Sequence, residues 1–391
     1  MIKSLSVKNL NGRMSFDLNF NDDINIITGK NGSGKTTVLK LIWYAISGNL
    51  ERIVQEIKFD SFTVVTDKIT ISMLKEDRKG RRFLKLSYQP TDGELKEIEK
   101  PIERTKRGEE LEDANRQVSK LTGSSVFFPT FRRIEGGFSV RGRSDDESVH
   151  YVEGNRVVMR SGSVYYSQSS NLTQAMTELS EHISVGQHRF VASISTDDLN
   201  RLLTSKYADI TERSNSLLME MSTFILSNVS NSEGSPEVGI PPERSQQLLS
   251  EILERAENVT KRSDHEKQPF TVLSKLIERI FQYKGIKVSG PVTLGQTKEA
   301  IASELLSAGE KQMLSFLCYN AFADKTCLFI DEPEISLHVD WQRVLFPVLL
   351  EQSTGNQFIV ATHSPFIYSR YADKELILGE RGDENANTKV D

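Results

Sequence analysis

The residues best suited to chemistry form one short run near the N-terminus, Gly29-Lys30-Asn31-Gly32-Ser33-Gly34-Lys35-Thr36. The run fits G-x-x-x-x-G-K-[ST], a loop that binds nucleotide phosphates. Its glycines let backbone N–H groups close around phosphate oxygens at the positive end of a helix. Lys35 then reaches the β- and γ-phosphates, and the Thr36 hydroxyl binds Mg²⁺. The predicted nucleotide-binding residues are Asn31, Gly32, Ser33, Gly34, Lys35, Thr36 and Thr37.

Two elements must hold this loop. Residues 24–28 contain three isoleucines and predict a buried strand. Residues 35–47 predict a helix, because Val38, Leu39, Ile42 and Ile46 share one face and Gly48 can end it. Strand, loop and helix follow one another in the order that phosphate binding needs. This order favours a phosphate loop over a glycine-rich turn.

A second strand carries acids at its end. Residues 326–330 are mostly apolar and are followed by Asp331 and Glu332. A carboxylate in the first position can hold the Mg²⁺ shell, and one in the second can polarise an attacking water. An apolar strand before an acidic turn is common by itself. The assignment of Asp331 as metal ligand and Glu332 as catalytic residue therefore depends on the phosphate loop.

Two further segments carry polar groups at element ends. Ser307-Ala308-Gly309 begins a predicted helix and can form a second anion-binding N-terminus. The alternative is an ordinary serine cap with Glu310 in the first turn. His363 follows a predicted strand, the apolar residues 359–361 and Thr362. The alternative is a structural histidine at the end of that strand.

Taken together, these segments resemble the motifs of the ABC ATPases. Residues 306–312 resemble the signature motif, Asp331-Glu332 the Walker B pair, 336–340 the D-loop, and His363 the switch histidine. The resemblance covers about residues 1–135 and 292–391. It implies an α/β fold, an ABC-type P-loop ATPase head with a mixed core sheet, an antiparallel side sheet and an inserted helical arm or subdomain.

The resemblance also implies a mechanism, with ATP and Mg²⁺ as cofactors. ATP binds between two subunits, so we expect a homodimer or a higher homo-oligomer. Ser307 and Gly309 of one head face the γ-phosphate that Lys35 of the other head holds. His363 contacts that phosphate, and Glu332 orients the water. The Q-loop glutamine of these heads has no clear match, and Gln168 and Gln174 are candidates by order alone.

The sequence divides into four predicted segments. Residues 1–135 form the N-terminal lobe of the head, 136–170 a flexible Ser/Gly/Arg-rich segment, 171–291 a helical insertion, and 292–391 the C-terminal lobe. In the first lobe, strands are expected over the following residues: 2–8, 14–20, 24–28, 62–65, 69–74, 83–88 and 126–128. The charged residues 95–122 predict a helix.

The insertion has the pattern of long helices. Thr196 can cap a helix whose residues Leu203, Tyr207, Ile210, Leu217, Met221 and Phe224 recur at heptad-like spacing. A Ser/Gly/Pro-rich linker, 230–242, precedes two more amphipathic helices near 248–256 and 272–281. An antiparallel arm fits this order, and a compact helical subdomain is the alternative.

Charge, cysteine content and apolar runs indicate which broad classes of protein fit this sequence. The chain has 391 residues and a formal net charge of −5, so it is no general electrostatic partner of nucleic acid. Arginines between 132 and 160 could touch nucleic acid, but the acids among them favour a solvated loop. Cys318 and Cys327 sit in apolar segments and predict buried thiols. With no apolar run for a membrane span and no signal peptide, we expect a cytoplasmic protein.

The resemblance extends to the standalone SMC/RecF-like ATPases of bacterial anti-phage defence. It rests on Asp331-Glu332-Pro333-Glu334, 338–342 and 363–366, and more weakly on 127–132 and 193–198. The ATPase component of the PARIS system is most similar, and the Septu-type ATPase is second. This implies a sensor and scaffold that controls a separate effector, a TOPRIM-type nuclease, and responds to a phage-encoded trigger protein.

The sequence is compatible with other functions. Related nucleases of the overcoming-lysogenisation-defect type carry a TOPRIM domain after the head, whereas this sequence ends soon after His363, so we expect the effector to be a separate polypeptide. The alternative function is a RecF-like DNA-repair ATPase that binds duplex DNA. A third possibility is a binding module in which ATP only joins subunits. The presence of Glu332 and His363 argues against it, because such a module does not need residues for hydrolysis.

Overall fold

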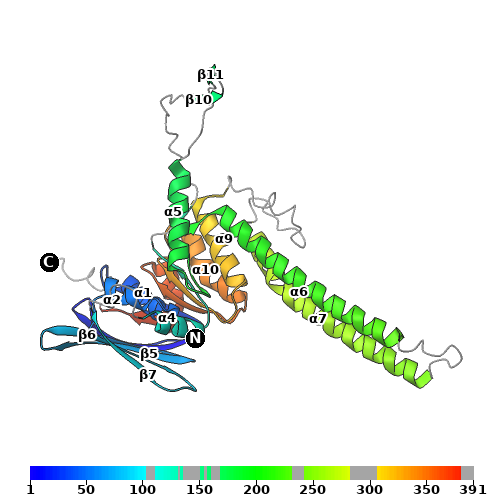
Figure 1. The fold of residues 1–391 in the computed structure, drawn as a ribbon, viewed down its shortest axis with the longest axis horizontal. Coiled ribbons are helices and arrows are strands. Elements are labelled where there is room, and N and C mark those ends of the chain that lie inside the picture. The colour runs from blue at the N-terminus through cyan, green and yellow to red at the C-terminus, as the bar shows by residue number, and fades with distance from the viewer. Residues whose placement is uncertain are drawn as a thin grey trace, which may run out of the picture.

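The computed structural model describes residues 1–102, 111–130, 133–134, 150–153, 156–159, 168–230, 242–281 and 306–379. These residues form a layered head and a long helical hairpin (Figure 1). The α/β class predicted from the sequence, with an antiparallel side sheet and a helical insertion, is confirmed. The four segment boundaries drawn from the sequence stay a prediction.

The core sheet has the strand order β12-β8-β14-β15-β3-β16. Its bounds are β3 Ile24–Thr28, β8 Ser125–Phe128, β12 His188–Phe190, β14 Cys327–Asp331, β15 Gln357–Ala361 and β16 Glu375–Ile377. A mixed sheet was expected, but every pairing among these strands is parallel. The reason is that crossovers such as α10 (Val339–Glu351), between β14 and β15, return the chain to the same end of the sheet.

The side sheet is antiparallel and has the order β2-β1-β4-β5-β6-β7. Its bounds are β1 Ile2–Leu10, β2 Met14–Asn19, β4 Ser61–Thr66, β5 Ile69–Arg78, β6 Arg81–Pro90 and β7 Lys96–Pro101. The helix predicted over 95–122 is therefore wrong in its first part. Lys96–Pro101 is a charged edge strand paired with β6, and α4 begins later, at Glu112–Leu121. Charged residues are usual on such edges, and they concealed the strand.

The remaining elements lie outside the two sheets. They are α2 Leu50–Glu56, α5 Gln168–Ile183, α9 Ala308–Ala321, α11 Pro365–Tyr368, η3 Ser369–Lys374, and the short strand pairs β9 Arg133–Ile134 with β13 Ser193–Ile194 and β10 His150–Glu153 with β11 Arg156–Met159. The β10–β11 pair projects away from the head beyond α5 (Figure 1). Most of the predicted flexible segment 136–170 lies outside the described residues. So do Arg132, Arg141, Arg143 and Arg160.

The helical insertion is an arm. Two antiparallel helices, α6 Thr196–Ser230 and α7 Pro242–Ile280, project from the head (Figure 1). At ~1.5 Å per residue, the 35 residues of α6 extend roughly 50 Å. The two later helices predicted from the sequence are one continuous helix, α7. The cap of α6 is Ser195 rather than Thr196, because the Ser195 hydroxyl accepts from the N–H of Asp198 at 3.0 Å.

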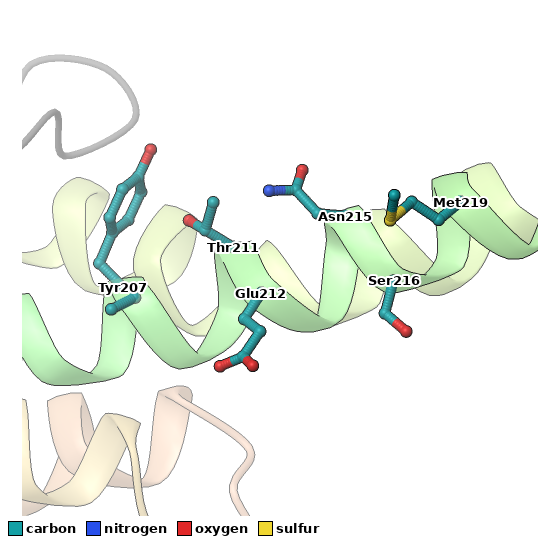
Figure 2. A pocket seen from close by; sticks show the side chains of 7 residues that line it. Tyr207, Thr211, Glu212, Asn215, Ser216 and Met219 are labelled. Carbon is teal, nitrogen blue, oxygen red and sulfur yellow. The ribbon is translucent and has the colours of Figure 1, made fainter.

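The predicted seam holds the arm together. Leu203 and Ile210 are buried, and Ser214, which fills the gap in the heptads, lies 2.9 Å from Ser263 of α7 between hydroxyl oxygens. A surface hollow of about 540 Å³ is lined by residues of α6 alone, including Tyr207 of the seam (Figure 2). The lining residues are Tyr207, Ala208, Thr211, Glu212, Asn215, Ser216 and Met219.

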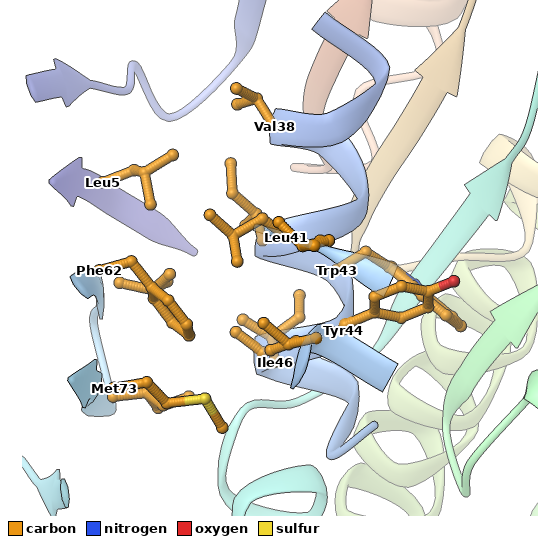
Figure 3. Close-up of a cluster of buried hydrophobic side chains, with 14 of the residues drawn as sticks. Leu5, Val38, Leu41, Trp43, Tyr44, Ile46, Phe62 and Met73 are labelled. Carbon is orange, nitrogen blue, oxygen red and sulfur yellow. The ribbon is translucent and has the colours of Figure 1, made fainter. Parts of the chain in front are cut away.

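Helix α1 (Lys35–Ser47) lies between the two sheets (Figure 3). Its predicted bounds are confirmed, and Gly48 ends it. Leu41 and Ile46 belong to the same buried cluster as Leu5 and Phe62 of the side sheet. On the other side, the Trp43 ring centroid lies 5.5 Å from that of Phe127 in β8. Since this helix is buried on nearly all sides, the loop that precedes it has a fixed position.

A second buried cluster covers the other face of the core sheet. It joins strand residues to α9, α10 and the inner ends of α6 and α7. The Phe128 ring of β8 meets the Phe316 ring of α9 edge-on, with the centroids 5.0 Å apart. The base of the arm thus packs on α9, the helix that Ser307 caps.

Cys318 and Cys327 are buried free thiols, as predicted. Burial raises the pKa of Cys318 to about 12 and that of Cys327 to about 11, so both stay protonated at neutral pH. Among the helices that the structure describes, none has the length and apolar character needed to cross a bilayer.

His188 in β12 is expected to make the stability of the fold depend on pH. Its ring is fully buried, its Nε2 lies 3.0 Å from the Ser119 carbonyl oxygen, and its Nδ1 lies 2.8 Å from the Ser125 hydroxyl. Burial lowers the pKa of His188 below its ordinary value of 6.5. The unfolded chain then binds this proton at a higher pH than the folded chain. We expect the free energy of unfolding to fall below pH 6.5 by up to about 1.4 kcal/mol per pH unit from this residue.

Chemical unfolding of the wild type and of His188→Gln between pH 5 and 7.5 measures this contribution. The variant should lose less stability over that range, whatever its stability at pH 7.5. His182→Gln, which changes an exposed histidine of α5, should behave like the wild type. Equal pH slopes in the wild type and His188→Gln would contradict the prediction.

Candidate active site

The phosphate loop lies at the end of β3 and leads into the first turn of α1. Gly34, the residue before the helix, has φ 88° and makes no side-chain cap. A side chain is disfavoured at that backbone angle, and the first N–H groups of α1 stay available for an anion. The loop also runs close to the chain after β16, because a Cβ on Gly29 would lie 2.4 Å from the Leu378 carbonyl oxygen.

Lys35 lies inside this loop. Its Nζ donates to the Gly29 carbonyl at 3.0 Å and lies 3.5 Å from Nδ1 of His363. Burial lowers the pKa of Lys35, while the charges of Glu332 and Asp331 raise it. The ammonium group therefore stands between the loop and the acidic end of β14.

Hydroxyl and carboxylate oxygens meet beside the lysine. The Thr36 hydroxyl donates to Oδ1 of Asp331 at 3.1 Å, and the Thr130 hydroxyl donates to Oδ2. Oxygen donors of this kind suit Mg²⁺, which takes one or two carboxylates together with substrate phosphates and water. The hydroxyl of Ser33 in the loop is buried and has no hydrogen-bond partner in the structure. The residues present therefore fit a magnesium–nucleotide.

Glu332 has a strained backbone. Its φ is 49°, and its N–H donates to the Ala361 carbonyl at 2.8 Å, which holds it against β15. Such angles in non-glycine residues are uncommon and gather at functional sites. Oε1 of Glu332 lies 3.7 Å from Nε2 of His363. Burial raises the pKa of the Glu332 carboxyl, and the charge of Asp331 raises it further, which suits a group that accepts a proton.

The residues of this site lie within a match to a known protein family. The model of the AAA ATPase domain family matches residues 1–368, which include the phosphate loop, Asp331, Glu332 and His363. The chain belongs to this AAA ATPase domain family. It is an ATPase, and the nucleotide binding predicted from the sequence follows from this membership.

Two curated proteins are similar to short parts of this AAA ATPase. Endonuclease GajA of Bacillus cereus (strain VD045) is 41% identical over 75 residues, which are 18% of this chain and 13% of GajA. Septu protein PtuA of Bacillus thuringiensis is 41% identical over 61 residues, which are 15% of each chain. The chain thus matches much less than two thirds of either relative.

Solved structures similar to the AAA ATPase include an Smc head domain. The Smc head with an extended coiled coil, bound to the C-terminal domain of ScpA from Pyrococcus furiosus, has a TM-score of 0.36 and 13% identity. The alignment covers 94% of this chain and 91% of that one. An SmcHead bound to the C-winged helix domain of ScpA has a TM-score of 0.35, 13% identity and the same coverage.

The predicted signature residues of the AAA ATPase are engaged within their own chain. Ser307 forms a capping box with Glu310, in which the Ser307 N–H donates to Oε2 of Glu310 at 2.6 Å. The serine cap considered as the alternative is therefore present, and Ser307 is also exposed. A Cβ on Gly309 would lie 2.4 Å from the Ser336 carbonyl oxygen, so α9 packs closely on the predicted D-loop. A role at a subunit interface stays a prediction.

Other predicted nucleotide-binding residues of the AAA ATPase lie along the loop. Asn31 and Gly32 are exposed, and the Arg13 guanidinium, from the turn after β1, donates to the Gly32 carbonyl. The Thr37 hydroxyl accepts a long hydrogen bond of 3.5 Å from Asn11 in the same turn. Arg13 was not predicted. The sequence does show a cationic residue, Arg13, in the turn next to Gly12. Only the tertiary structure places that turn beside the phosphate loop.

Thr130 was also missed by sequence reasoning. It follows β8, whose neighbour in the sheet is β14, so both strands end at the same edge. The Thr130 hydroxyl, just after β8, therefore reaches the Asp331 carboxylate. The Q-loop candidates Gln168 and Gln174 belong to α5, in a part whose side chains lie outside the described residues.

Proposed function

We propose that this ATPase hydrolyses ATP with Mg²⁺ at the phosphate loop, in composite sites that a second copy of the chain completes. The observation that carries the proposal is the convergence of Lys35, Asp331, Glu332 and His363 at the ends of three adjacent parallel strands. Ligands bind at such strand ends in open α/β sheets.

Each residue has a role in the proposed reaction. The N–H groups that begin α1 and the Lys35 ammonium would hold the β- and γ-phosphates, while Thr36 and Asp331 would hold the metal ion. When bound, Mg²⁺ neutralises charge on the phosphoryl oxygens. Glu332 orients a water and accepts its proton as the water oxygen bonds to the γ-phosphorus and the bond to the bridging oxygen breaks. The products are ADP and phosphate, and His363 hydrogen-bonds to the γ-phosphate.

Ser307 and Gly309 are proposed to complete the site of a second copy. The position of Ser307 supports this, because it is exposed at the N-terminus of α9, where the positive end of the helix dipole favours an anion. Ser307→Arg is expected to lower ATP-driven association by at least tenfold, since a bulky cation would fill the interface. Light scattering after size-exclusion chromatography, with and without ATP, measures association.

The matched control is Ser307→Ala, which also removes the cap but adds no bulk. Losing a cap costs ~1 kcal/mol of stability, so both variants should be slightly less stable in the absence of ATP. Ser307→Ala should still associate. If Ser307→Arg associates like the wild type, the signature segment does not lie at a composite site.

The biological role we propose is that of a sensor and scaffold in anti-phage defence. The partial similarity to Septu protein PtuA and to Endonuclease GajA supports this class. The sequence resemblance to the PARIS ATPase adds a separate effector, a TOPRIM-type nuclease, and a phage-encoded trigger protein. The long α6–α7 arm is a structural element on which such partners can assemble.

Capture of partners from the native host tests this role. Tagged Glu332→Gln protein is incubated with ATP in the host lysate, and bound proteins are identified by mass spectrometry, with Lys35→Ala as the control that cannot hold ATP. A nuclease that binds only to the ATP-trapped form supports the defence role. Recombination proteins with nuclease-sensitive DNA would instead indicate the RecF-like repair function.

A further inference from the structure

Glu334, in the turn after β14, makes contacts that the proposed reaction does not explain. Its Oε1 accepts hydrogen bonds from the N–H of His363 at 2.7 Å and the N–H of Ser364 at 3.1 Å. The same oxygen accepts from the Thr362 hydroxyl at 2.9 Å. Hydrogen bonds to an ionised carboxylate are about twice as strong as neutral ones. One carboxylate oxygen therefore holds three successive residues, the switch segment 362–364.

Further hydrogen bonds fix the turn and the switch segment against the helices. Gln312 of α9 is fully buried, and its Nε2 donates to the Pro333 carbonyl at 2.8 Å. Gln342 of α10 accepts from the Ser364 hydroxyl at 2.6 Å and donates to the Leu337 carbonyl at 2.9 Å. The turn after β14 and the switch segment are thus one hydrogen-bonded unit, anchored in α9 and α10.

The imidazole of His363 is placed by this unit. One ring nitrogen, Nδ1, lies 3.5 Å from Lys35 Nζ, and the other, Nε2, lies 3.7 Å from Glu332 Oε1. Both distances depend on where the His363 backbone lies. Displacement of a reacting group by about 1 Å can lower a rate by roughly 10²-fold.

We propose that Glu334 is a positioning residue, whose carboxylate fixes the backbone of the switch segment and so keeps the His363 imidazole between Lys35 and Glu332. The inference rests on the proposed function for its effect on turnover. The placement of the ring is a separate claim that can be measured without nucleotide. Oε2 of Glu334 is buried and has no hydrogen-bond partner in the structure, so Oε1 alone carries the contacts.

Two substitutions separate the contacts from the charge. Glu334→Ala removes the acceptor, whereas Glu334→Gln keeps an acceptor oxygen of nearly the same shape. Glu351→Ala removes an exposed carboxylate at the end of α10, paired with Arg279, and serves as control. Hydrogen exchange of the amides in 362–364 and the ¹³C-labelled imidazole signal of His363 are measured without nucleotide, and the signal is assigned by its loss in His363→Gln.

In Glu334→Ala, amide exchange in the switch segment should rise by about 10–100-fold. The His363 signal should shift, and kcat should fall by about 10–100-fold with KM for ATP changed less than threefold. Glu334→Gln should keep amide exchange and kcat within about threefold of the wild type and leave the His363 signal near its wild-type position. Glu351→Ala should change none of these.

An unchanged His363 signal and unchanged exchange in Glu334→Ala would overturn the proposal. Faster exchange without a shift of the imidazole signal would also overturn it, because Glu334 would then be a structural contact only. A wild-type protein without ATP turnover would overturn the proposed function, while the nucleotide-free measurements would still decide whether Glu334 places the ring.

Discussion

Glu332→Gln is expected to lower the rate of ATP hydrolysis by about 10²–10⁴-fold, the usual contribution of general base catalysis, and to leave ATP binding intact. Glutamine keeps the shape of the side chain and can still orient a water, but it cannot accept the proton. The pKa of the Glu332 carboxyl is raised by burial and by Asp331, so the native group holds a proton more strongly than an ordinary glutamate. Phosphate release at saturating ATP measures the rate.

Binding must be measured on the same variant. We expect ATP to stabilise Glu332→Gln at least as much as the wild type, because Lys35 and the N–H groups of α1 are unchanged. Without hydrolysis, the dimer proposed above should accumulate in the presence of ATP. Glu351→Gln, at an exposed position, is the control. Turnover of Glu332→Gln within threefold of the wild type would remove Glu332 from the catalytic role.

Lys35→Ala is expected to abolish the stabilisation of the protein by ATP. A ligand at ~100 times its Kd adds ~2.7 kcal/mol to the free energy of unfolding, which is readily seen in a thermal melt. The variant loses the Lys35 ammonium group, whose Nζ lies inside the phosphate loop, 3.0 Å from the Gly29 carbonyl oxygen. It should therefore melt at the same temperature with and without ATP and Mg²⁺.

The comparison must be made within each variant, because removing a buried lysine also changes the stability of the protein without ATP. Lys40→Ala is a matched control from the same helix, where Lys40 lies 4.0 Å from Glu56 on a partly exposed face. Lys40→Ala should keep the full rise in melting temperature that ATP causes in the wild type. A normal ATP-induced rise in melting temperature for Lys35→Ala would show that this loop does not bind the nucleotide.

The sequence by itself determined those parts of the site that depend on residue types at fixed spacing along the chain. The phosphate loop needs glycines, a lysine and a hydroxyl at fixed spacing between a strand and a helix, and α1 has the predicted bounds Lys35–Ser47. Asp331 was predicted because it ends an apolar strand in a sequence that also has a phosphate loop, whereas the role of His363 was implied by the resemblance to the ABC ATPases. Periodicity also gave the seam of α6, because heptad spacing is a local property.

Tertiary structure decided the rest, because the contacts involved join residues far apart in sequence. Lys96–Pro101 became a strand because β6 offered an edge, although its charges favoured a helix. The choice between an arm and a compact subdomain depended on whether α6 and α7 pack on each other or fold back on the head. Local periodicity is the same in both cases.

The same limit explains the contacts that sequence reasoning missed at the site. Thr130 reaches Asp331 only because β8 and β14 are neighbours in the sheet. Glu334 belongs to a predicted motif, yet its partners lie in the switch segment after β15. Spacing along the chain specifies which groups can do chemistry, whereas strand order specifies which of them meet.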